Sequence, residues 1–296
     1  MPDLSVVIPT FDTASMTLRC CRAVLASMPP RGEVIVADDG SSDGTRELLA
    51  REVPSVQVVR LDSNHGFTTA ANRGVEVSRG RIILLLNSDA AVQDDALQEI
   101  VAAFDADPML GVAGARLLHE DGKPQWSGGQ TPTLPWMIGV VSGAGRFARF
   151  FRRRPEPMQQ REVDWVSGAA MAIRREVWEV AGPLDERFRF YCQDIDLCLR
   201  ARQAGWRVRI IESAHVIHAI GGTVAGDSAL RHDPERLWPD LFDWGTAHYG
   251  RRWSVLARFV FVSVAWLRIA WRSVYRRDET TKALVRAAGK IRLSRD

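Results

Sequence analysis

The sequence lacks both a cysteine framework and a long apolar run. Its four cysteines form no Cys-x-x-Cys pair and no spacing typical of disulfide scaffolds or zinc sites, so a reducing compartment is expected. The first residues enter a strand pattern at once, without the basic start and longer apolar run of a secretory signal, and none is expected. The apolar stretch Phe259–Leu267 is far shorter than the roughly twenty residues that a spanning helix needs.

What the chain does have is an ordinary globular composition with an uneven distribution of charge. Its 296 residues are 46% hydrophobic and 25% charged, which suits one large α/β domain with an appendage, or two small domains. Residues 251–296 hold 12 Lys and Arg against 3 Asp and Glu, whereas the preceding 250 residues carry a net negative charge. This basic tail predicts an anionic partner, and its aromatic and aliphatic content favours a membrane surface over nucleic acid.

Short apolar runs alternate with helical patterns through about residue 120. Strands are predicted at 4–8, 33–37, 56–60 and 81–86, and helices ending near 26 and at 45–52, 68–77 and 94–104. Continuous apolar strands separated by helices predict a parallel sheet that is covered on both faces. In such sheets ligands bind beyond the carboxyl ends of the strands, which directs attention to the loops there.

After residue 110 the pattern becomes less regular. A strand is predicted at 111–118, then a hairpin turn at Asp121-Gly122 and a long mobile loop over the site, rich in Gly, Pro and Arg, at 128–160. The remaining predictions are strands at 165–173 and 206–211 and helices at 175–181 and 194–204. No internal repeat is found.

Short polar residues follow all four of the early strands. They occupy 10–12, 38–43, 64–67 and 87–89. Each loop taken singly is equally well explained as a capped turn, because turns favour these residue types. Their shared position at one sheet edge predicts a binding site, in which Asp89 is the best-placed carboxylate for a divalent cation. The alternative role of Asp89 is to cap the turn that follows it.

Seven runs of residues resemble the motifs of family 2 inverting glycosyltransferases. They begin with VVIPTF at 6–11, VADDGSSDGT at 36–45, NHGF at 64–67 and LLLNSD at 84–89, and continue at 166–175, 182–188 and 191–200. The resemblance runs in order from about residue 3 to 223. The rhamnosyltransferase-like branch is the most similar, since it has Asn-x-Asp where other members have Asp-x-Asp, and a hairpin like the one at 121–129.

This resemblance implies a fold and a reaction. The fold is α/β of the GT-A type, a Rossmann-like nucleotide-binding sheet with an acceptor-side extension and C-terminal amphipathic helices. The implied catalytic domain is 1–223, with a nucleotide-binding half at about 1–120 and an acceptor half at about 121–223, followed by a helical basic tail at 224–296. The implied reaction transfers a sugar, rhamnose in that branch, from a UDP- or dTDP-linked donor to a hydroxyl of a glycan or polyprenyl-linked acceptor. Mg²⁺ or Mn²⁺ is the implied cofactor.

Residue roles follow from the same resemblance. Asp38 would accept a hydrogen bond from the N3–H of uracil or thymine, and Asp194 would be the catalytic base. Thr10 and Phe11 would line the base pocket, and Asp89 and His218 would be metal ligands. Trp165 and Gly168 would shape the sugar and acceptor pocket. Contacts to ribose, diphosphate or donor sugar would come from Asn64, Asn72, Arg73, Ser88 and Asn87, the last of which would also lie beside the cation.

Competing interpretations accompany several of these roles. Asp194 could be the N-terminal anion of its helix, stabilised by the helix dipole. His218 could be an ordinary satisfied side chain, and Trp165 could mainly pack. Two positions depart from the family pattern: Gln193 replaces a glutamate beside the base, and Asn87 removes one carboxylate from the metal site, which predicts weaker metal binding.

The basic tail predicts a surface helix. Arg268, Arg272 and Arg276 recur every four residues among tryptophans and aliphatic residues, which suits a helix in an anionic headgroup region. The alternative is a helix packed on the catalytic domain with its arginines solvated. A membrane helix would place the enzyme peripherally on the cytoplasmic face of the cell membrane, where the basic loop at 146–154 could meet the diphosphate of a lipid-linked acceptor.

The sequence also bears on three rival functions. A nucleotidyltransferase would need a Gly-rich basic loop after the first strand, which Pro9–Thr13 is not. An inactive sugar-nucleotide binding module is compatible with Gln193 and Asn87. A nucleic-acid binder is left unsupported by the polar residues at the sheet edge, and no nucleic-acid partner is expected.

Overall fold

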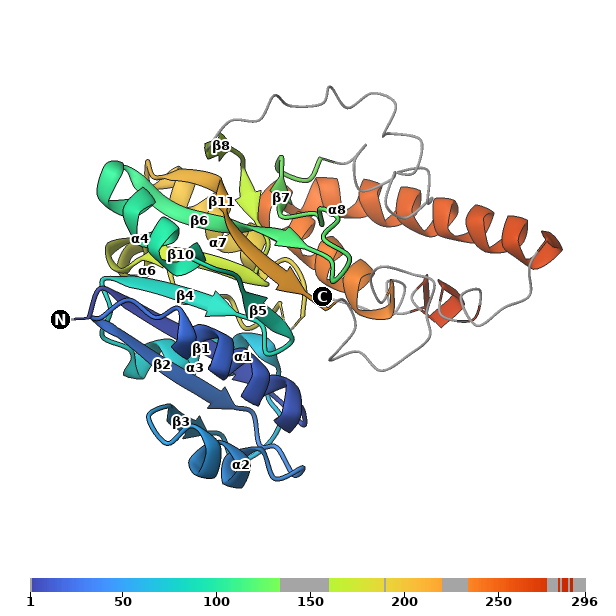
Figure 1. The fold of residues 1–296 in the computed structure, drawn as a ribbon. Coiled ribbons are helices and arrows are strands. Elements are labelled where there is room, and N and C mark those ends of the chain that lie inside the picture. The colour runs from blue at the N-terminus through green and yellow to red at the C-terminus, as the bar shows by residue number, and fades with distance from the viewer. Residues whose placement is uncertain are drawn as a thin grey trace. The chain divides into compact units, whose positions relative to one another are not determined.

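A computed structural model describes residues 2–133, 160–188, 190–219 and 234–275, with 282, 284–286 and 288–289 (Figure 1). The chain divides into two compact units. The first unit comprises residues 1–131, 157–189 and 193–225, and the second comprises residues 132–156, 190–192 and 226–296. Most of the predicted mobile loop at 128–160, including 146–154, lies outside the described residues, as does Arg276.

The first unit is built on one nine-stranded sheet, in which eight strands follow one another and β8 pairs with β11. In spatial order the strands are β3 (Gln57–Arg60), β2 (Gly32–Asp38), β1 (Leu4–Thr10), β4 (Ile82–Leu86), β10 (Ala170–Arg174), β6 (Leu110–Leu118), β11 (Arg207–His218) and β5 (Ala90–Val92), and β8 is Gln160–Glu162. The four strands predicted at the start of the chain are therefore neighbours, with β1 at the centre of the group.

The parallel sheet predicted for these four strands is confirmed, and the sheet as a whole is mixed. β1 pairs in parallel with β2 and β4, and β2 with β3. β10 runs antiparallel to both β4 and β6, and β5 runs antiparallel to β11. An apolar run has the same pattern in either orientation, so strand direction depends on the connection and not on the composition of the strand.

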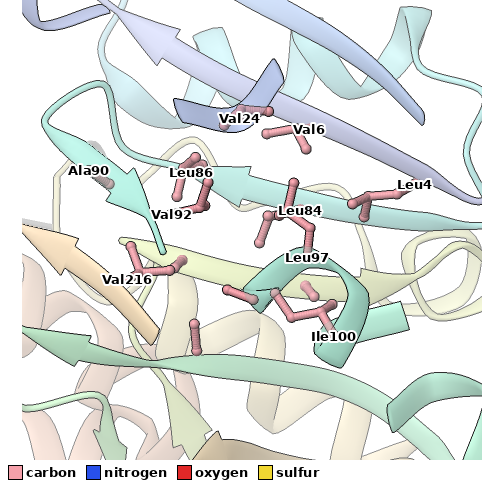
Figure 2. Close-up of a cluster of buried hydrophobic side chains, with 14 of the residues drawn as sticks. Leu4, Val6, Val24, Leu84, Leu86, Ala90, Val92, Leu97, Ile100 and Val216 are labelled. Carbon is pink, nitrogen blue, oxygen red and sulfur yellow. The ribbon is translucent and has the colours of Figure 1, made fainter. Parts of the chain in front are cut away.

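Helices cover both faces of this sheet, as predicted. Alternate strand residues such as Leu4, Val6 and Leu84 share one buried cluster with residues of α1 (Ala14–Ala26), α2 (Thr45–Glu52) and α4 (Ala96–Ala106) (Figure 2). The other face is covered by α3 (Phe67–Val77), α6 (Arg175–Ala181) and α7 (Gln193–Gln203). Continuous burial of β1 and β4 on both faces explains why these strands read as unbroken apolar runs.

The predicted strand at 165–173 is two strands separated by a turn. β9 (Trp165–Val166) pairs with β7 (Gly128–Gly129) in a second small sheet, and β10 begins only at Ala170. The intervening turn is closed by a hydrogen bond from the Ala170 N–H to the Ser167 carbonyl, 3.4 Å long. The chain bends here to change partners, which a continuous apolar run does not reveal.

β11 is longer than predicted, because three different strands pair with it. It lies beside β6 in parallel and beside β5 and β8 antiparallel, with a register shift between Ile211 and His215. The hairpin turn at Asp121-Gly122 is confirmed: Gly122 has a φ of +75°, and the His119 N–H donates to the Lys123 carbonyl at 2.8 Å. β5 was not predicted, because three residues are too few to show a period.

The described helical part of the second unit centres on α8 (Pro234–Tyr275), which is two helices joined at Gly250. Gly250 has φ 83° and ψ 174°, a conformation that glycine adopts without steric cost. The rings of Phe242 and Phe261, one from each half, lie 6.4 Å apart, and the guanidinium of Arg258 lies 5.1 Å from the Phe242 ring centroid. The two halves therefore pack against each other. Among the described residues, no helix is long and apolar enough to cross a membrane.

Candidate functional site

The loops that follow β1 and β2 are joined by two aspartates. Asp12 accepts a hydrogen bond from the Ser42 N–H at 2.7 Å, and Asp43 accepts one from the Ala14 N–H at 2.8 Å. Ala14 is the first residue of α1, so its N–H has no partner within that helix. Each loop thus completes the hydrogen bonding of the other, and the two form one surface at the carboxyl edge of the sheet.

Asp39 connects this surface to the loop after β3. Its two carboxylate oxygens accept hydrogen bonds from the backbone N–H groups of His65 and Gly66, each at 2.8 Å. Gly66 precedes α3 and has a φ of +98°, which strongly favours glycine. The sequence predicted no role for Asp39. In the structure, Asp39 holds the Asn64-His-Gly-Phe segment in place.

Asp38 has a buried carboxylate, and one of its oxygens accepts no hydrogen bond from the described residues. Asp38 is fully buried at the end of β2, and its Oδ1 accepts from the Ser41 N–H at 2.9 Å. Oδ2 is also buried and accepts no hydrogen bond from the described residues, while the nearest cationic group, Nη1 of Arg60, lies 3.8 Å away. A buried acceptor of this kind costs free energy unless a ligand supplies a donor.

The hydroxyl groups of Thr10 and Ser88 lie in a buried cluster beneath the loops. The Thr10 hydroxyl contacts those of Thr17 at 2.6 Å and Thr13 at 2.8 Å, and the Thr13 hydroxyl lies 3.3 Å from that of Ser88. These contacts join the end of β1 to the Asn-Ser-Asp segment after β4. A contact of either residue with a nucleotide stays a prediction.

The other predicted donor-binding residues differ in how accessible they are. Phe11 is 37% exposed, and Asn64 is exposed as well. Asn72 is buried, and its amide exchanges two hydrogen bonds of 3.0 Å with the backbone of Leu184. Asn72 therefore fixes the segment after α6. Arg73 pairs with Glu76 on the surface of α3 at 2.7 Å. Contacts of all four residues with the donor stay predictions.

Asp89 and His218 are brought together by β5. The pairing of β5 with β11 sets Ala90 opposite His218, and the Ala219 N–H donates to the Asp89 carbonyl at 3.2 Å. The Asp89 side chain is only 3% exposed, and its Oδ1 lies 3.3 Å from Nε2 of His218. The two residues are 129 positions apart in the sequence, so their proximity is a product of the sheet.

Gln125 fixes the orientation of the His218 ring. Its Oε1 lies 3.2 Å from Nδ1 of His218, and its Nε2 donates to the carbonyl of the same residue at 2.5 Å. An amide oxygen only accepts, so Nδ1 of His218 donates to Gln125. An amide N–H₂ only donates, so the lone pair of Nε2 accepts from Nδ2 of Asn87 at 3.2 Å, on the same side as Asp89.

This arrangement fits a divalent cation. Oδ1 of Asp89 is buried and accepts no hydrogen bond within the described part of the chain, and the lone pair of His218 lies beside it. A carboxylate oxygen and a neutral imidazole nitrogen, held by a second hydrogen-bonding partner, are suitable metal ligands. The described residues contain no group of three or more His, Cys, Asp or Glu that could hold a metal. Substrate phosphates and water would therefore complete the coordination, as is usual for Mg²⁺.

Asp194 lies in the first turn of α7 and is held by two backbone groups. Its Oδ2 accepts from the Gly168 N–H at 2.9 Å, and its Oδ1 accepts from the Ile195 N–H at 2.8 Å. Burial raises the pKa of the Asp194 carboxyl, and the hydrogen bonds from Gly168 and Ile195 offset only part of that rise. A carboxylate that is more basic than usual is suited to accept a proton.

The candidate metal site and Asp194 are linked through neighbouring strand ends. The Asn87 N–H donates to the Ala169 carbonyl at 3.0 Å, and Ala169 follows Gly168, which holds Asp194. Asn87 is also two residues before Asp89. The ends of β4 and β10 therefore bring the two carboxylate-bearing segments to one edge of the sheet.

Trp165 is buried beside this turn. Its indole N–H donates to the Gln130 carbonyl at 2.9 Å, and its ring packs edge-on against Trp126 at a centroid distance of 5.0 Å. Trp126 is 38% exposed, whereas Trp165 is 6% exposed. Trp165 thus has a packing role, and its predicted part in shaping the sugar and acceptor pocket, together with that of Gly168, stays a prediction.

Sequence reasoning missed Asp39 and Gln125. Asp39 adjoins Asp38 within the predicted loop, so its sheet-edge position was the signal that could have identified it. Gln125 lies within the hairpin that carried the family resemblance, but its partner is 93 residues away. No spacing rule connects positions so far apart.

The half of the sheet formed by β1 to β4 has an Asn-x-Asp segment at its carboxyl edge. This combination is typical of one class of protein, the GT-A type sugar-nucleotide-dependent transferases. The comparison with families is in agreement, since the model of "Glycosyl transferase family 2" matches residues 5–181. The chain belongs to glycosyl transferase family 2 and is a glycosyltransferase, as the resemblance implied.

Curated relatives include sugar transferases of polysaccharide assembly. An N-acetylglucosaminyl-diphospho-decaprenol L-rhamnosyltransferase from Mycobacterium tuberculosis is 26% identical over 76% of this chain and 79% of its own length. The O-antigen biosynthesis protein RfbC from Myxococcus xanthus is 28% identical over 73% of this chain, but only 17% of its own length is matched.

Two solved structures share the fold. The mannosyltransferase PcManGT from Pyrobaculum calidifontis, in complex with GDP-Man and Mn²⁺, matches with a TM-score of 0.58 and 15% identity over 100% of this chain and 88% of its own. GalNAc-T7 with UDP, GalNAc and Mn²⁺ matches with a TM-score of 0.57 and 16% identity over 74% of this chain and 44% of its own. The predicted GT-A fold is confirmed.

Proposed function

We propose that this glycosyltransferase transfers a sugar, with inversion, from a nucleoside diphosphate to an acceptor hydroxyl. One observation carries the proposal: Asp194 and the segment that bears Asp89 are joined at the ends of β10 and β4 through Gly168, Ala169 and Asn87. A base for the acceptor and ligands for the leaving group would then stand at one edge of the sheet.

The proposed reaction is a single displacement. The acceptor oxygen attacks the anomeric carbon, and the bond from that carbon to the diphosphate oxygen breaks, with its electron pair leaving on the diphosphate. Asp194 takes the proton from the acceptor hydroxyl as the new bond forms. Its raised pKa and its fixed orientation between Gly168 and Ile195 support this role. Attack opposite the leaving group inverts the anomeric configuration.

The proposed cofactor is Mg²⁺ or Mn²⁺, held by Asp89 and His218 with Asn87 beside it. When bound, the cation would neutralise the charge that develops on the departing diphosphate. Gln125 holds Nδ1 of His218 so that Nε2 is directed toward Asp89, and the buried Oδ1 of Asp89 lacks a hydrogen bond from the described residues. Both features support the assignment, and both solved structures of the same fold contain Mn²⁺.

The proposed nucleotide base is uracil or thymine. Both rings carry an N3–H, which the buried Oδ2 of Asp38 would accept. The proposed donor sugar is rhamnose, and the proposed acceptor is a glycan or a polyprenyl diphosphate carrying one, because the relative from Mycobacterium tuberculosis is named for that chemistry. An acceptor of this kind would place the enzyme peripherally on the cytoplasmic face of a membrane.

A donor panel tests the proposal. The purified chain is incubated with Mn²⁺ or Mg²⁺ and dTDP-, UDP- or GDP-linked sugars, and release of the nucleoside diphosphate is measured with and without a polyprenyl-diphosphate acceptor. Turnover of a dTDP or UDP sugar, stimulated by the acceptor and abolished by EDTA, is expected. Turnover of GDP sugars alone would contradict the role of Asp38.

An inactive binding module remains the second candidate, because Gln193 stands where the family has glutamate and is buried beside Asp194. Calorimetry with the same nucleotides separates the two. Tight binding with no turnover of any donor would favour the module.

A further inference from the structure

The second half of α8 carries a long stretch in which the exposed residues are apolar. Between Trp253 and Ala270, every side chain that the structure describes as exposed is apolar: Val255, Leu256, Phe259, Trp266, Leu267 and Ala270. Phe259 is 73% exposed and Leu267 is 71% exposed. Isolated exposed apolar residues are common on proteins, but a helix whose exposed positions are all apolar is a feature of interaction surfaces.

These six residues lie on one face of the helix. Successive residues of an α-helix are turned by about 100°, so the six positions fall within an arc of about 120°. That arc extends over about 22 Å of helix, at 1.5 Å for each residue. We call this set of six residues the outer apolar face.

The outer apolar face is not needed for the core of the second unit. The opposite side of the same helix buries Ala257, Phe261, Ala265 and Ile269. Phe261 and Arg258 pack on Phe242 of the preceding half, so this side already has its partner. The helix therefore carries two apolar sides, one satisfied within the unit and one facing solvent.

The charge of the segment indicates what covers the outer apolar face. From 244 to 277 the sequence holds seven arginines and no aspartate or glutamate. A second copy of this segment would carry the same net positive charge, and like-charge repulsion disfavours its approach. Anionic lipid headgroups are attracted to such a segment, at about 1 kcal/mol for each basic residue near the surface. Tryptophan, phenylalanine and leucine are the side chains that interfacial helices insert beneath the headgroups.

We propose that the outer apolar face docks this chain on an anionic membrane, with the second half of α8 lying in the interface. Leu256, Phe259 and Leu267 insert below the headgroups, and Arg251 and Arg252, which are exposed at the start of this half, interact with lipid phosphates. The proposal rests on the exposure and charge of the second unit and not on the proposed sugar transfer, so each can fail without the other.

Flotation with lipid vesicles tests the proposal. The full chain is mixed with vesicles of phosphatidylglycerol and phosphatidylcholine, or of phosphatidylcholine alone, and the bound fraction gives a partition coefficient. The triple variant Leu256→Gln, Phe259→Gln, Leu267→Gln removes the insertion without touching the buried side. Its partition coefficient for the anionic vesicles is expected to fall about 100-fold. The wild-type chain is expected to bind the neutral vesicles at least about tenfold more weakly.

A matched control changes equally exposed apolar residues elsewhere. The variant Met109→Gln, Val180→Gln lies in the first unit, where the two residues are 47% and 66% exposed, and should bind vesicles as the wild type does. The triple variant should keep the wild-type melting temperature and nucleotide affinity, which shows that it folds.

Two results would overturn the proposal. One is a triple variant that binds anionic vesicles as tightly as the wild type. The other is a wild-type chain that ignores vesicles but forms a dimer, by light scattering, that the triple variant abolishes, since a second copy would then be the occupant.

Discussion

Gln125 contacts His218 at two atoms at once, with Oε1 3.2 Å from the ring Nδ1 and Nε2 2.5 Å from the backbone carbonyl. The side chain therefore sets both the tautomer of the ring and the position of the strand end that carries it. Because Nε2 of His218 faces Asp89, Gln125 in the hairpin at 121–129 controls the geometry of the candidate metal site.

Replacing Gln125 by leucine should weaken metal binding. The variant loses the acceptor that keeps the proton on Nδ1, so the imidazole can rotate or protonate Nε2, and metal affinity should fall by about 10- to 100-fold. Mn²⁺ titration followed by electron paramagnetic resonance, in the presence of nucleotide, measures the change directly. The exposed substitution Gln98→Leu on α4 serves as a control, and unchanged Mn²⁺ affinity in Gln125→Leu would contradict the assigned tautomer.

Asp194→Asn should abolish transfer while leaving nucleotide binding intact. The asparagine side chain keeps its size but accepts no proton, so kcat is expected to fall by about 10²- to 10⁴-fold. Calorimetry with the nucleoside diphosphate should give an affinity within about twofold of the wild type, because Asp38 and Asp89 are unchanged. Turnover near the wild-type rate would remove Asp194 from the role of base.

The pH dependence of kcat/KM should reflect the raised pKa of Asp194. The base works only when ionised, so activity is expected to fall as the pH drops through that pKa, about tenfold for each unit below it. Because burial raises the pKa, this acidic limb should lie above pH 3.8, the usual aspartate value. A profile of initial rates from about pH 3 to 9 with saturating Mn²⁺ tests this. An acid limb at or below that usual value would contradict the buried environment.

Asp38→Asn should alter the choice of nucleotide base. The Oδ1 contact with the Ser41 N–H can persist, but an amide N–H₂ then replaces Oδ2 and opposes the N3–H of uracil or thymine. Two opposed donors cost about 1–3 kcal/mol, so the affinity for UDP or dTDP should fall by about 10- to 100-fold. CDP, whose cytosine N3 is an acceptor, should bind relatively better. Equal losses for all three nucleotides would indicate a structural role for Asp38 instead.

The sequence alone was sufficient for the nucleotide-binding half of the fold. The apolar residues of the runs at 4–8, 33–37 and 81–86 form strands buried on both faces, and apolar continuity of this kind is local information. The polar segments after these strands could also be placed at one edge, because parallel strands end on the same side. The positions of Asp38, Asn87 and Asp89 at this edge could therefore be predicted from the sequence, whereas their roles came from the resemblance to the family and stay predictions.

Other features could not be predicted from the sequence. The antiparallel direction of β10, the three-residue strand β5 and the turn at Ser167–Ala170 depend on which segments pair across the sheet. The same limit applies to side chains: no local pattern predicts that the Asn72 amide binds the backbone of Leu184, 112 residues away.

The sequence by itself determined the types of residue available for chemistry and the edge of the sheet at which they stand. Tertiary structure alone decided which of them meet: His218 with Asp89 and Gln125, Asp194 with Gly168, and the apolar side of α8 that stays exposed. The physical reason is that periodicity and turn chemistry act between neighbours in the chain, whereas hydrogen bonds and burial act between neighbours in space.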